Sequence, residues 1–404
     1  MLRCKPSLFA FFLLVLPLAL RAAEDKDSKP TTQWTDKITI SGDFRYRHEF
    51  ISQETFNSTT SEKTRVFDRN RHRIRLRLEL KGQVNDKLDL YTRIATSTFS
   101  NGTGDPISTN QDLNDGFTPK PIWLDRAYVN FHPFKELQAR AGKQPVPFEN
   151  TDLVWDPDIN MEGIAALTAL DIEKNAVFLR LGGFWAGERG PATFTKHALD
   201  QGLFGSQVGG KVRIGKAVAQ LAAAYFDYGN VKNNPALYSP NTFFGNSSTN
   251  IAERGTDTLG YLFDYNLINV KTSIGCKLKK VEPTAVFDFV TNTAAKRDAA
   301  YGKKLSTSWL VGLTTKFTSL PIDWDLSYNY RVQQKDATMA AYADSDPAGG
   351  GTNYNGHKIA FGFHALTNTR LGLTYFRNIK DPESKDAEKK FNYDRIQADL
   401  EVRF

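Results

Sequence analysis

The stretch Arg71-His72-Arg73-Ile74-Arg75-Leu76-Arg77-Leu78-Glu79-Leu80 decides the fold class of this chain. Ionised and apolar side chains alternate along it, and successive side chains of a β-strand point to opposite faces. As a strand, the segment has one face of isoleucine and leucine and one face rich in arginine. A helix would scatter both sets around its circumference, so the pattern predicts a strand.

The same alternation recurs along the chain from about residue 37 onward. The last segment places Ile396, Ala398, Leu400, Val402 and Phe404 on one face and Arg395, Gln397, Asp399, Glu401 and Arg403 on the other. Sixteen strands are expected, at 37–50, 71–84, 87–99, 122–134, 136–145, 161–171, 174–186, 206–215, 217–230, 256–268, 281–292, 305–318, 321–334, 355–367, 369–380 and 391–404. The pattern is weakest at 161–171 and 269–280, so counts of fourteen or eighteen stay open.

Alternation alone fits a soluble β-sandwich as well as a membrane barrel, in which the apolar face meets lipid and the polar face meets water. Three features favour the barrel. The strands are near the length that a tilted strand needs to cross a bilayer. Short turns alternate with longer loops such as 51–70 and 335–353, and an even strand number brings both termini to the periplasmic side. The terminal Phe404 resembles the C-terminal signal by which outer-membrane barrels are recognised for assembly.

The N-terminus indicates export from the cytoplasm. Arg3 and Lys5 precede an apolar run from Leu8 to Leu20, and Ala22-Ala23 follow it. This order is typical of a secretory signal peptide, predicted here at 1–23. The run is shorter than the roughly 20 residues of a membrane-spanning helix, which disfavours an anchor. Residues 24–36 are then a short periplasmic segment, and 37–404 form an all-β, transmembrane antiparallel barrel.

Sixteen strands enclose a water-filled channel rather than a core of side chains. The alternation gives the lumen face of the first five strands a basic character. The predicted pore-lining residues are Arg45, Arg47, Arg73, Arg75, Arg77, Arg93, Arg126 and Arg140, with Arg180, Lys211, Arg213 and Arg395 continuing the set more sparsely. The alternative interpretation is that these arginines only balance acidic neighbours and stiffen the wall.

The loop at about 145–160 combines prolines, apolar residues and acids. Its predicted constriction residues are Glu149, Asp152, Asp156 and Asp158. We expect this loop to fold into the barrel and to place carboxylates opposite the arginines. Cations on one side of a narrow neck and anions on the other create a transverse field that favours polar solutes over apolar ones.

The stretch from Gly142-Lys143-Gln144 through Leu153-Val154-Trp155-Asp156-Pro157-Asp158-Ile159-Asn160 to Glu162-Gly163 resembles the bacterial putative-porin family of outer-membrane channels. The signal peptide and Phe404 agree with that resemblance. It implies a sixteen-stranded diffusion channel and, by similarity with general porins, an inward third loop and a homotrimer. It says little about the solute.

The sequence therefore predicts an outer-membrane porin for passive diffusion of small hydrophilic solutes and ions, with no catalysis, cofactor or metal. Expected partners are the lipid bilayer, lipopolysaccharide, small polar solutes and the outer-membrane assembly machinery; nucleic acid is excluded by export. A selective anion or phosphate channel is the alternative, since arginine binds phosphate in a fork geometry. A plugged structural or adhesive barrel and a membrane lipid hydrolase are weaker alternatives.

Overall fold

The computed structural model describes residues 34–57, 62–100, 103–114, 116–188, 200–238, 242–251, 259–318, 322–386 and 389–404. The predicted signal peptide at 1–23 and most of the segment at 24–36 lie outside the described residues. The helical elements in the described part are short 3₁₀ turns, and none of them has the length and apolar character of a membrane-spanning helix.

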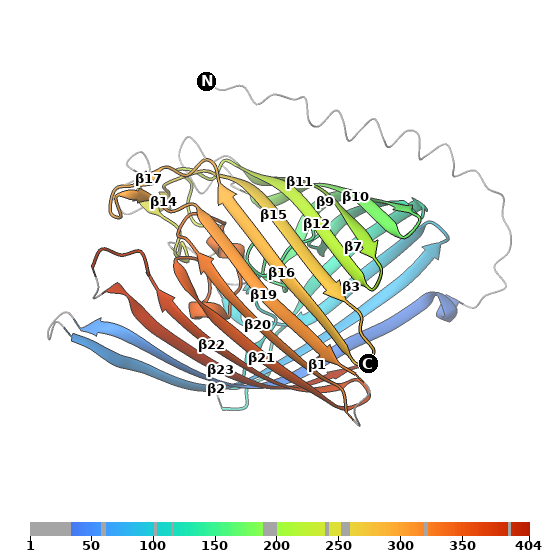
Figure 1. Ribbon diagram of the computed structural model, residues 1–404, viewed down its shortest axis with the longest axis horizontal. Coiled ribbons are helices and arrows are strands. Elements are labelled where there is room, and N and C mark those ends of the chain that lie inside the picture. Colours follow the sequence, from blue (N-terminus) through green and yellow to red (C-terminus); the bar gives the residue numbers. More distant parts are fainter. Residues whose placement is uncertain are drawn as a thin grey trace, which may run out of the picture.

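Sixteen long antiparallel strands form one sheet that closes into a barrel, which confirms the predicted fold class and strand number (Figure 1). The strands are β1 (Ile38–Asn57), β2 (Glu62–Asn85), β3 (Leu88–Thr96), β7 (Ile122–Phe134), β8 (Leu137–Pro145), β9 (Asn160–Ile172), β10 (Asn175–Gly187), β11 (Gln201–Ile214), β12 (Ala217–Gly229), β15 (Tyr265–Cys276), β16 (Val281–Asn292), β19 (Thr307–Phe317), β20 (Trp324–Gln333), β21 (Tyr354–Leu366), β22 (Thr369–Lys380) and β23 (Phe391–Arg403). The last strand pairs with the first, with Arg45 opposite Glu401. Closure leaves no free edge, as backbone groups in hydrocarbon require.

The polarity of the wall is inverted relative to a soluble protein. Leu76, Leu78 and Leu80 of β2 are each more than a third exposed, whereas Arg73 on the opposite face is 7% exposed. In β23, Ile396 is 42% exposed and Arg395 is 4% exposed. The apolar faces point outward to lipid and the charged faces point into the lumen, as the alternation predicted.

Four strands have bounds that differ clearly from the sequence prediction. The tenth strand is Tyr265–Cys276 and not 256–268. Its lumen face begins with Tyr265 and Leu267, both buried, and the outer face begins with Asn266, so the usual order of a charged lumen face and an apolar outer face is lost there. The predicted loop at 51–70 is wrong, because β1 and β2 continue pairing as far as Asn57 and Glu62. The strand predicted at 206–215 begins already at Gln201, where buried lumen side chains again blur the pattern.

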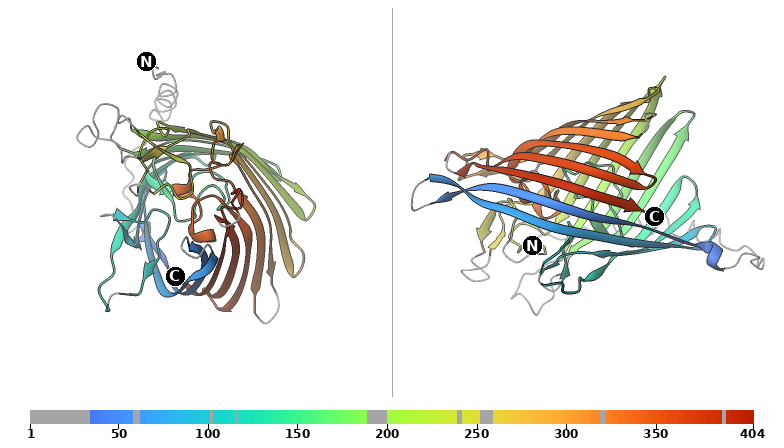
Figure 2. Two further views of the ribbon diagram at one scale, coloured as in Figure 1. Left: turned by 90° about the vertical axis from the view of Figure 1, so that its left-hand side faces the viewer. Right: turned by 90° about the horizontal axis from the view of Figure 1, so that it is seen from below.

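The lumen is not empty at the end that carries the long loops. Loop residues pack against wall residues of β9 to β19 in an apolar core that includes Phe148, Trp155, Phe226 and Tyr228. Looking along the barrel, the short turns η3 (Ala340–Tyr342) and η4 (Pro347–Gly349) are seen inside the ring of strands (Figure 2, left). One side of the lumen is therefore an apolar, filled region, and the charged wall lies on the other side.

Candidate functional site

Most of the arginines predicted to line the pore form ion pairs with carboxylates of neighbouring strands or loops. The contacts are Arg45 with Glu401 at 3.7 Å, Arg47 with Asp399 at 2.6 Å, Arg73 with Asp112 at 2.7 Å, Arg75 with Asp43 at 2.7 Å, Arg77 with Asp43 at 2.7 Å, Arg126 with Glu79 at 3.0 Å, and Arg93 with Asp125. Arg140 differs, because no carboxylate of the described residues lies within 4.0 Å of it; its guanidinium donates to Gln138 at 3.0 Å. Most of the positive charge on this part of the lumen wall is therefore compensated by carboxylates.

The loop between β8 and β9 spans the lumen and makes ion pairs with several distant strands. Glu149 accepts from Arg180 of β10 at 2.8 Å and lies 3.6 Å from Lys271 of β15. Asp152 accepts two hydrogen bonds of 2.9 Å from Arg331 of β20. The opposite end of the same loop is fixed to the arginine wall.

That opposite end is the Asp158 carboxylate. It lies 3.2 Å from Arg77 of β2 and accepts from Thr109 of the β3–β7 loop at 2.9 Å. Four acids of this loop are predicted to face the arginines of the first five strands. Within the described part of the chain, Asp158 is the one that forms an ion pair with one of these arginines, Arg77. Asp152 and Glu149 instead face cations on other strands.

Apolar and backbone contacts hold the middle of this loop in place. Phe148 is 3% exposed and lies edge-on to Phe226, with ring centroids 4.9 Å apart. Thr151 donates from its backbone and its hydroxyl to Asp288, which is fully buried on β16. These contacts hold the loop in one position against the inner wall of the barrel.

Gly142, in the stretch that carries the family resemblance, explains how the chain enters the loop. Gly142 has φ +122° and pairs with Gly163 across β8 and β9. A Cβ at Gly142 would lie 2.3 Å from the carbonyl oxygen of Ala127. Only glycine tolerates this left-handed backbone and the close approach of a neighbouring strand.

A second inward loop, at 334–353 between β20 and β21, packs against the first. The backbone N–H of Asp156 donates to the carbonyl of Tyr342 at 2.8 Å, and the N–H of Ser345 donates to the Asp156 carboxylate at 2.9 Å. Arg331, 1% exposed, bridges the two loops by also reaching Asp344 at 3.1 Å. The neck is therefore shaped by two loops, whereas the sequence predicted one.

The carboxylates of these loops have unlike protonation behaviour. Burial raises the pKa of Asp344 to about 7, and the neighbouring Asp152 carboxylate adds to the rise. Burial and the nearby Asp158 raise the pKa of Asp156 well above its ordinary value. Burial also acts to raise the pKa of Asp346, but Arg47 and Arg395 outweigh it and hold that pKa below the usual range.

Sequence reasoning missed Arg331, Lys358 and Asp346 of this network. The signal was present, because Arg331 and Lys358 fall on the lumen faces of β20 and β21 by the same period of two. The inward course of 334–353 had a weaker signal, a high content of alanine and glycine. Asp346 follows from neither pattern, since its partners Arg47 and Arg395 come from the two ends of the chain.

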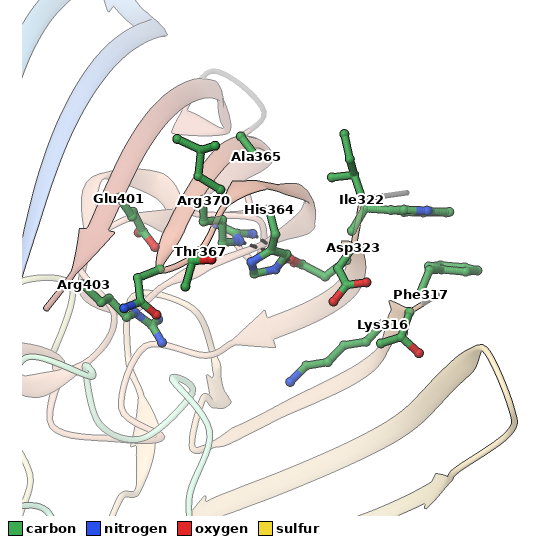
Figure 3. A pocket seen from close by; sticks show the side chains of 15 residues that line it. Lys316, Phe317, Ile322, Asp323, His364, Ala365, Thr367, Arg370, Glu401 and Arg403 are labelled. Carbon is green, nitrogen blue, oxygen red and sulfur yellow. Dashed lines mark hydrogen bonds and ion pairs between the residues drawn. The ribbon is translucent and has the colours of Figure 1, made fainter. Parts of the chain in front are cut away.

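The periplasmic half of the lumen is more open and less balanced. A pocket of about 870 Å³ lies at this end, with His364, Arg370, Lys316 and Arg403 in its lining (Figure 3). His364 and Arg370 both form ion pairs with Asp325. Lys316 and Arg403 line the same pocket, and neither has a described carboxylate within 4.0 Å. Strand pairing places Glu282 and Asp325 on either side of Lys316 and Asp43 opposite Arg403, so these cations have acidic neighbours but make no close ion pair with them.

A protein-family model described as "Putative porin" matches residues 19–256 and 241–404. The chain belongs to this family. The porin also shares its fold with solved outer-membrane proteins. It is similar to the outer membrane channel DcaP of Acinetobacter baumannii, with 12% identity over 91% of this chain and 97% of that one, at a TM-score of 0.51.

Two further structures have a comparable likeness. Pseudomonas putida OprB has 10% identity over 92% of this chain and 95% of its own, at a TM-score of 0.54. Salmonella typhi OmpF, solved in complex with daunomycin, has 9% identity over 92% of this chain and 99% of its own, at a TM-score of 0.51. No match was found among proteins of curated function. Family and fold together make this porin a passive-diffusion channel of the bacterial outer membrane.

Proposed function

We propose that this porin is a general-diffusion channel for small hydrophilic solutes with a weak preference for anions. The observation that carries this proposal is the distribution of paired and unpaired charge along the lumen. At the neck, cations and carboxylates pair across the inward loops, so that neither sign dominates there. Such a neck admits polar solutes of both signs and disfavours apolar ones, because these must displace ordered water.

The preference for anions comes from the periplasmic half. Five lumen cations there have no described carboxylate within 4.0 Å, namely Arg140, Lys211, Arg213, Lys316 and Arg403. A wall with surplus positive charge raises the local anion concentration in a water-filled passage. Because these groups are partly solvated, salt screens them over a Debye length of about 8–10 Å, and the preference is weak at physiological ionic strength.

Planar-bilayer recordings of the purified porin test this proposal. Ohmic conductance is expected in KCl, with a reversal potential in a salt gradient that lies on the anion side. A preference for anions that falls toward zero as the salt concentration is raised would agree with wall charges that salt screens. Absence of conductance from a folded, inserted protein would refute the channel and favour a plugged barrel.

Two finer expectations remain proposals. We propose that Phe404 belongs to the assembly signal, supported by its position at the end of an alternating strand and by its 59% exposure on the outer face. We also propose a homotrimer, supported by membership of a porin family. Cross-linking of the detergent-solubilised protein, followed by measurement of the mass of the unheated product, tests the trimer. A purely monomeric product would refute it.

A further inference from the structure

A second pocket of about 400 Å³ lies in the periplasmic half of the lumen, on the wall formed by β2, β3, β7 and β8. Its lining combines Lys81, Tyr91, Tyr128, Asn130 and Arg140. Cross-strand pairing places Lys81, Tyr91 and Tyr128 in one row, and Arg140 pairs with Asn130 in the adjacent row. Polar groups from four strands thus converge on one hollow, outside the neck described above.

The aromatic pair at this pocket is held rigid from both sides. The rings of Tyr91 and Tyr128 are stacked, with centroids 4.8 Å apart and planes 3° from parallel. Lys81 lies over the outer face of the pair at 5.6 Å from the Tyr91 centroid, and Arg140 lies 5.9 Å from the Tyr128 centroid. Cation–π contacts of this kind fix the positions of two long cationic side chains. The cationic groups are therefore preorganised.

Three buried polar atoms of the pocket lining make no hydrogen bond to the described residues. They are the Arg140 Nε–H, a donor, the Asn130 Oδ1, an acceptor, and the His132 Nε2, which lies 3.3 Å from the Asp89 carboxylate. A buried polar atom without a partner costs free energy, so a partner from the lumen is expected. The guanidinium suits a carboxylate, which it binds through paired N–H groups. The amide oxygen suits a hydroxyl, which donates to it.

The charge of the lining agrees with an anionic occupant. The Asp89 carboxylate lies 3.2 Å from Lys81 and 3.3 Å from His132, and Lys135 lies 3.5 Å from Glu136. Asp89 thus offsets one cation, and Arg140 keeps its charge without a carboxylate partner in the described structure.

We infer that this pocket is a binding site for small hydroxylated carboxylates, such as sugar acids, on their way through the channel. The carboxylate binds Arg140, and hydroxyls bind Asn130 and the phenol groups of Tyr91 and Tyr128. The inference rests on the proposed channel function, because the solute reaches the pocket through the lumen. A site of this kind concentrates the acid below the neck and makes its flux saturate.

Block of KCl current by gluconate tests the inference, with glucose as the neutral probe of similar size. In the wild-type porin, gluconate is expected to reduce the current with saturation, and glucose at equal concentration is not. Arg140→Gln is expected to raise the half-blocking gluconate concentration at least ~10-fold, since a charged hydrogen-bonded contact is lost. The matched control is Lys143→Gln, which removes one charge from the same strand β8, on its outward face beside Glu162. This control should leave the half-blocking concentration unchanged.

Each result decides one question. Equal block in the wild type and Arg140→Gln, or equal block by glucose and gluconate, would overturn the binding site and leave the conducting channel intact. No current in the wild type would instead overturn the proposed function. If Arg140→Gln fails to assemble, Asn130→Asp serves in its place, because it keeps the size of the side chain and sets a carboxylate against the ligand. It should weaken gluconate block, and unaltered block in that variant would also refute the site.

Discussion

Replacement of Arg331 by methionine should release the constriction loop. Arg331 is 1% exposed and contacts Asp152 twice at 2.9 Å and Asp344 at 3.1 Å. Removing one partner of a buried ion pair costs about 3–5 kcal/mol, because the remaining charges stay buried without compensation. Lys358 still lies 3.3 Å from Asp152, so the lower end, about 3 kcal/mol, applies here.

That free energy corresponds to a change of about 100-fold in the ratio of docked to undocked loop, since each 1.4 kcal/mol is a factor of ten. Single-channel recording should show higher conductance with transitions between levels. The triple variant R331M/D152N/D344N should restore quiet, wild-type conductance, because it removes the carboxylate charges together with the cation. Lys277→Met, at an exposed pair with Glu282, is the matched control, and should change stability by less than about 1 kcal/mol. If R331M conducts like the wild type and unfolds at the same urea concentration as K277M, the loop is not held by this network.

Three further outcomes follow from the charges and the barrel closure. The pKa of Asp344 is raised to about 7 in the folded protein, whereas an unfolded carboxyl group has a pKa near 4. Protonation of Asp344 therefore stabilises the folded loop fully below about pH 4, and this stabilisation is lost as the pH rises through 7. The reversal potential in a KCl gradient should therefore move toward cation selectivity between pH 6 and 8, because the deprotonated Asp344 adds a negative charge to the lumen. The shift should be smaller in Asp344→Asn, which separates the effect of Asp344 from that of the lumen histidines. Identical shifts in the two proteins would contradict this. The double variant K316Q/R403Q should shift the reversal potential toward cations more than R73Q/D112N, which removes a balanced pair; the reverse order would place selectivity at the neck. Deletion of Phe404, whose backbone exchanges hydrogen bonds of 2.8 and 3.1 Å with Gly42, should reduce the heat-modifiable protein in the outer-membrane fraction, and normal recovery would argue against its role in assembly.

Alternation predicted the strands and the face on which arginines such as Arg73 lie, and strand length, the order of short turns and long loops, and the terminal Phe404 were needed to predict a barrel with inverted polarity. It was not enough to predict their partners. Arg47 pairs with Asp399, 352 residues away, because β23 closes on β1, and closure is not encoded in any local pattern. The period of two also vanishes where lumen side chains are apolar, as at Leu267, because the loops turn that part of the lumen into a core. The inward loop was found from its own composition, but its contacts with Arg331 depend on which strands the closed ring places opposite.

The β1–β2 hairpin extends well beyond what crossing a membrane requires. A strand of 20 residues, the length of β1, measures about 66 Å, and at a tilt near 40° it rises about 50 Å, roughly twice the height of the apolar band. The surplus lies at the end opposite Phe404 and the start of β1, beyond the rim of most other strands (Figure 1). The hairpin therefore forms a narrow two-stranded ribbon that stands clear of the barrel rim, so its outer part pairs only within itself and is not supported by neighbouring strands of the wall.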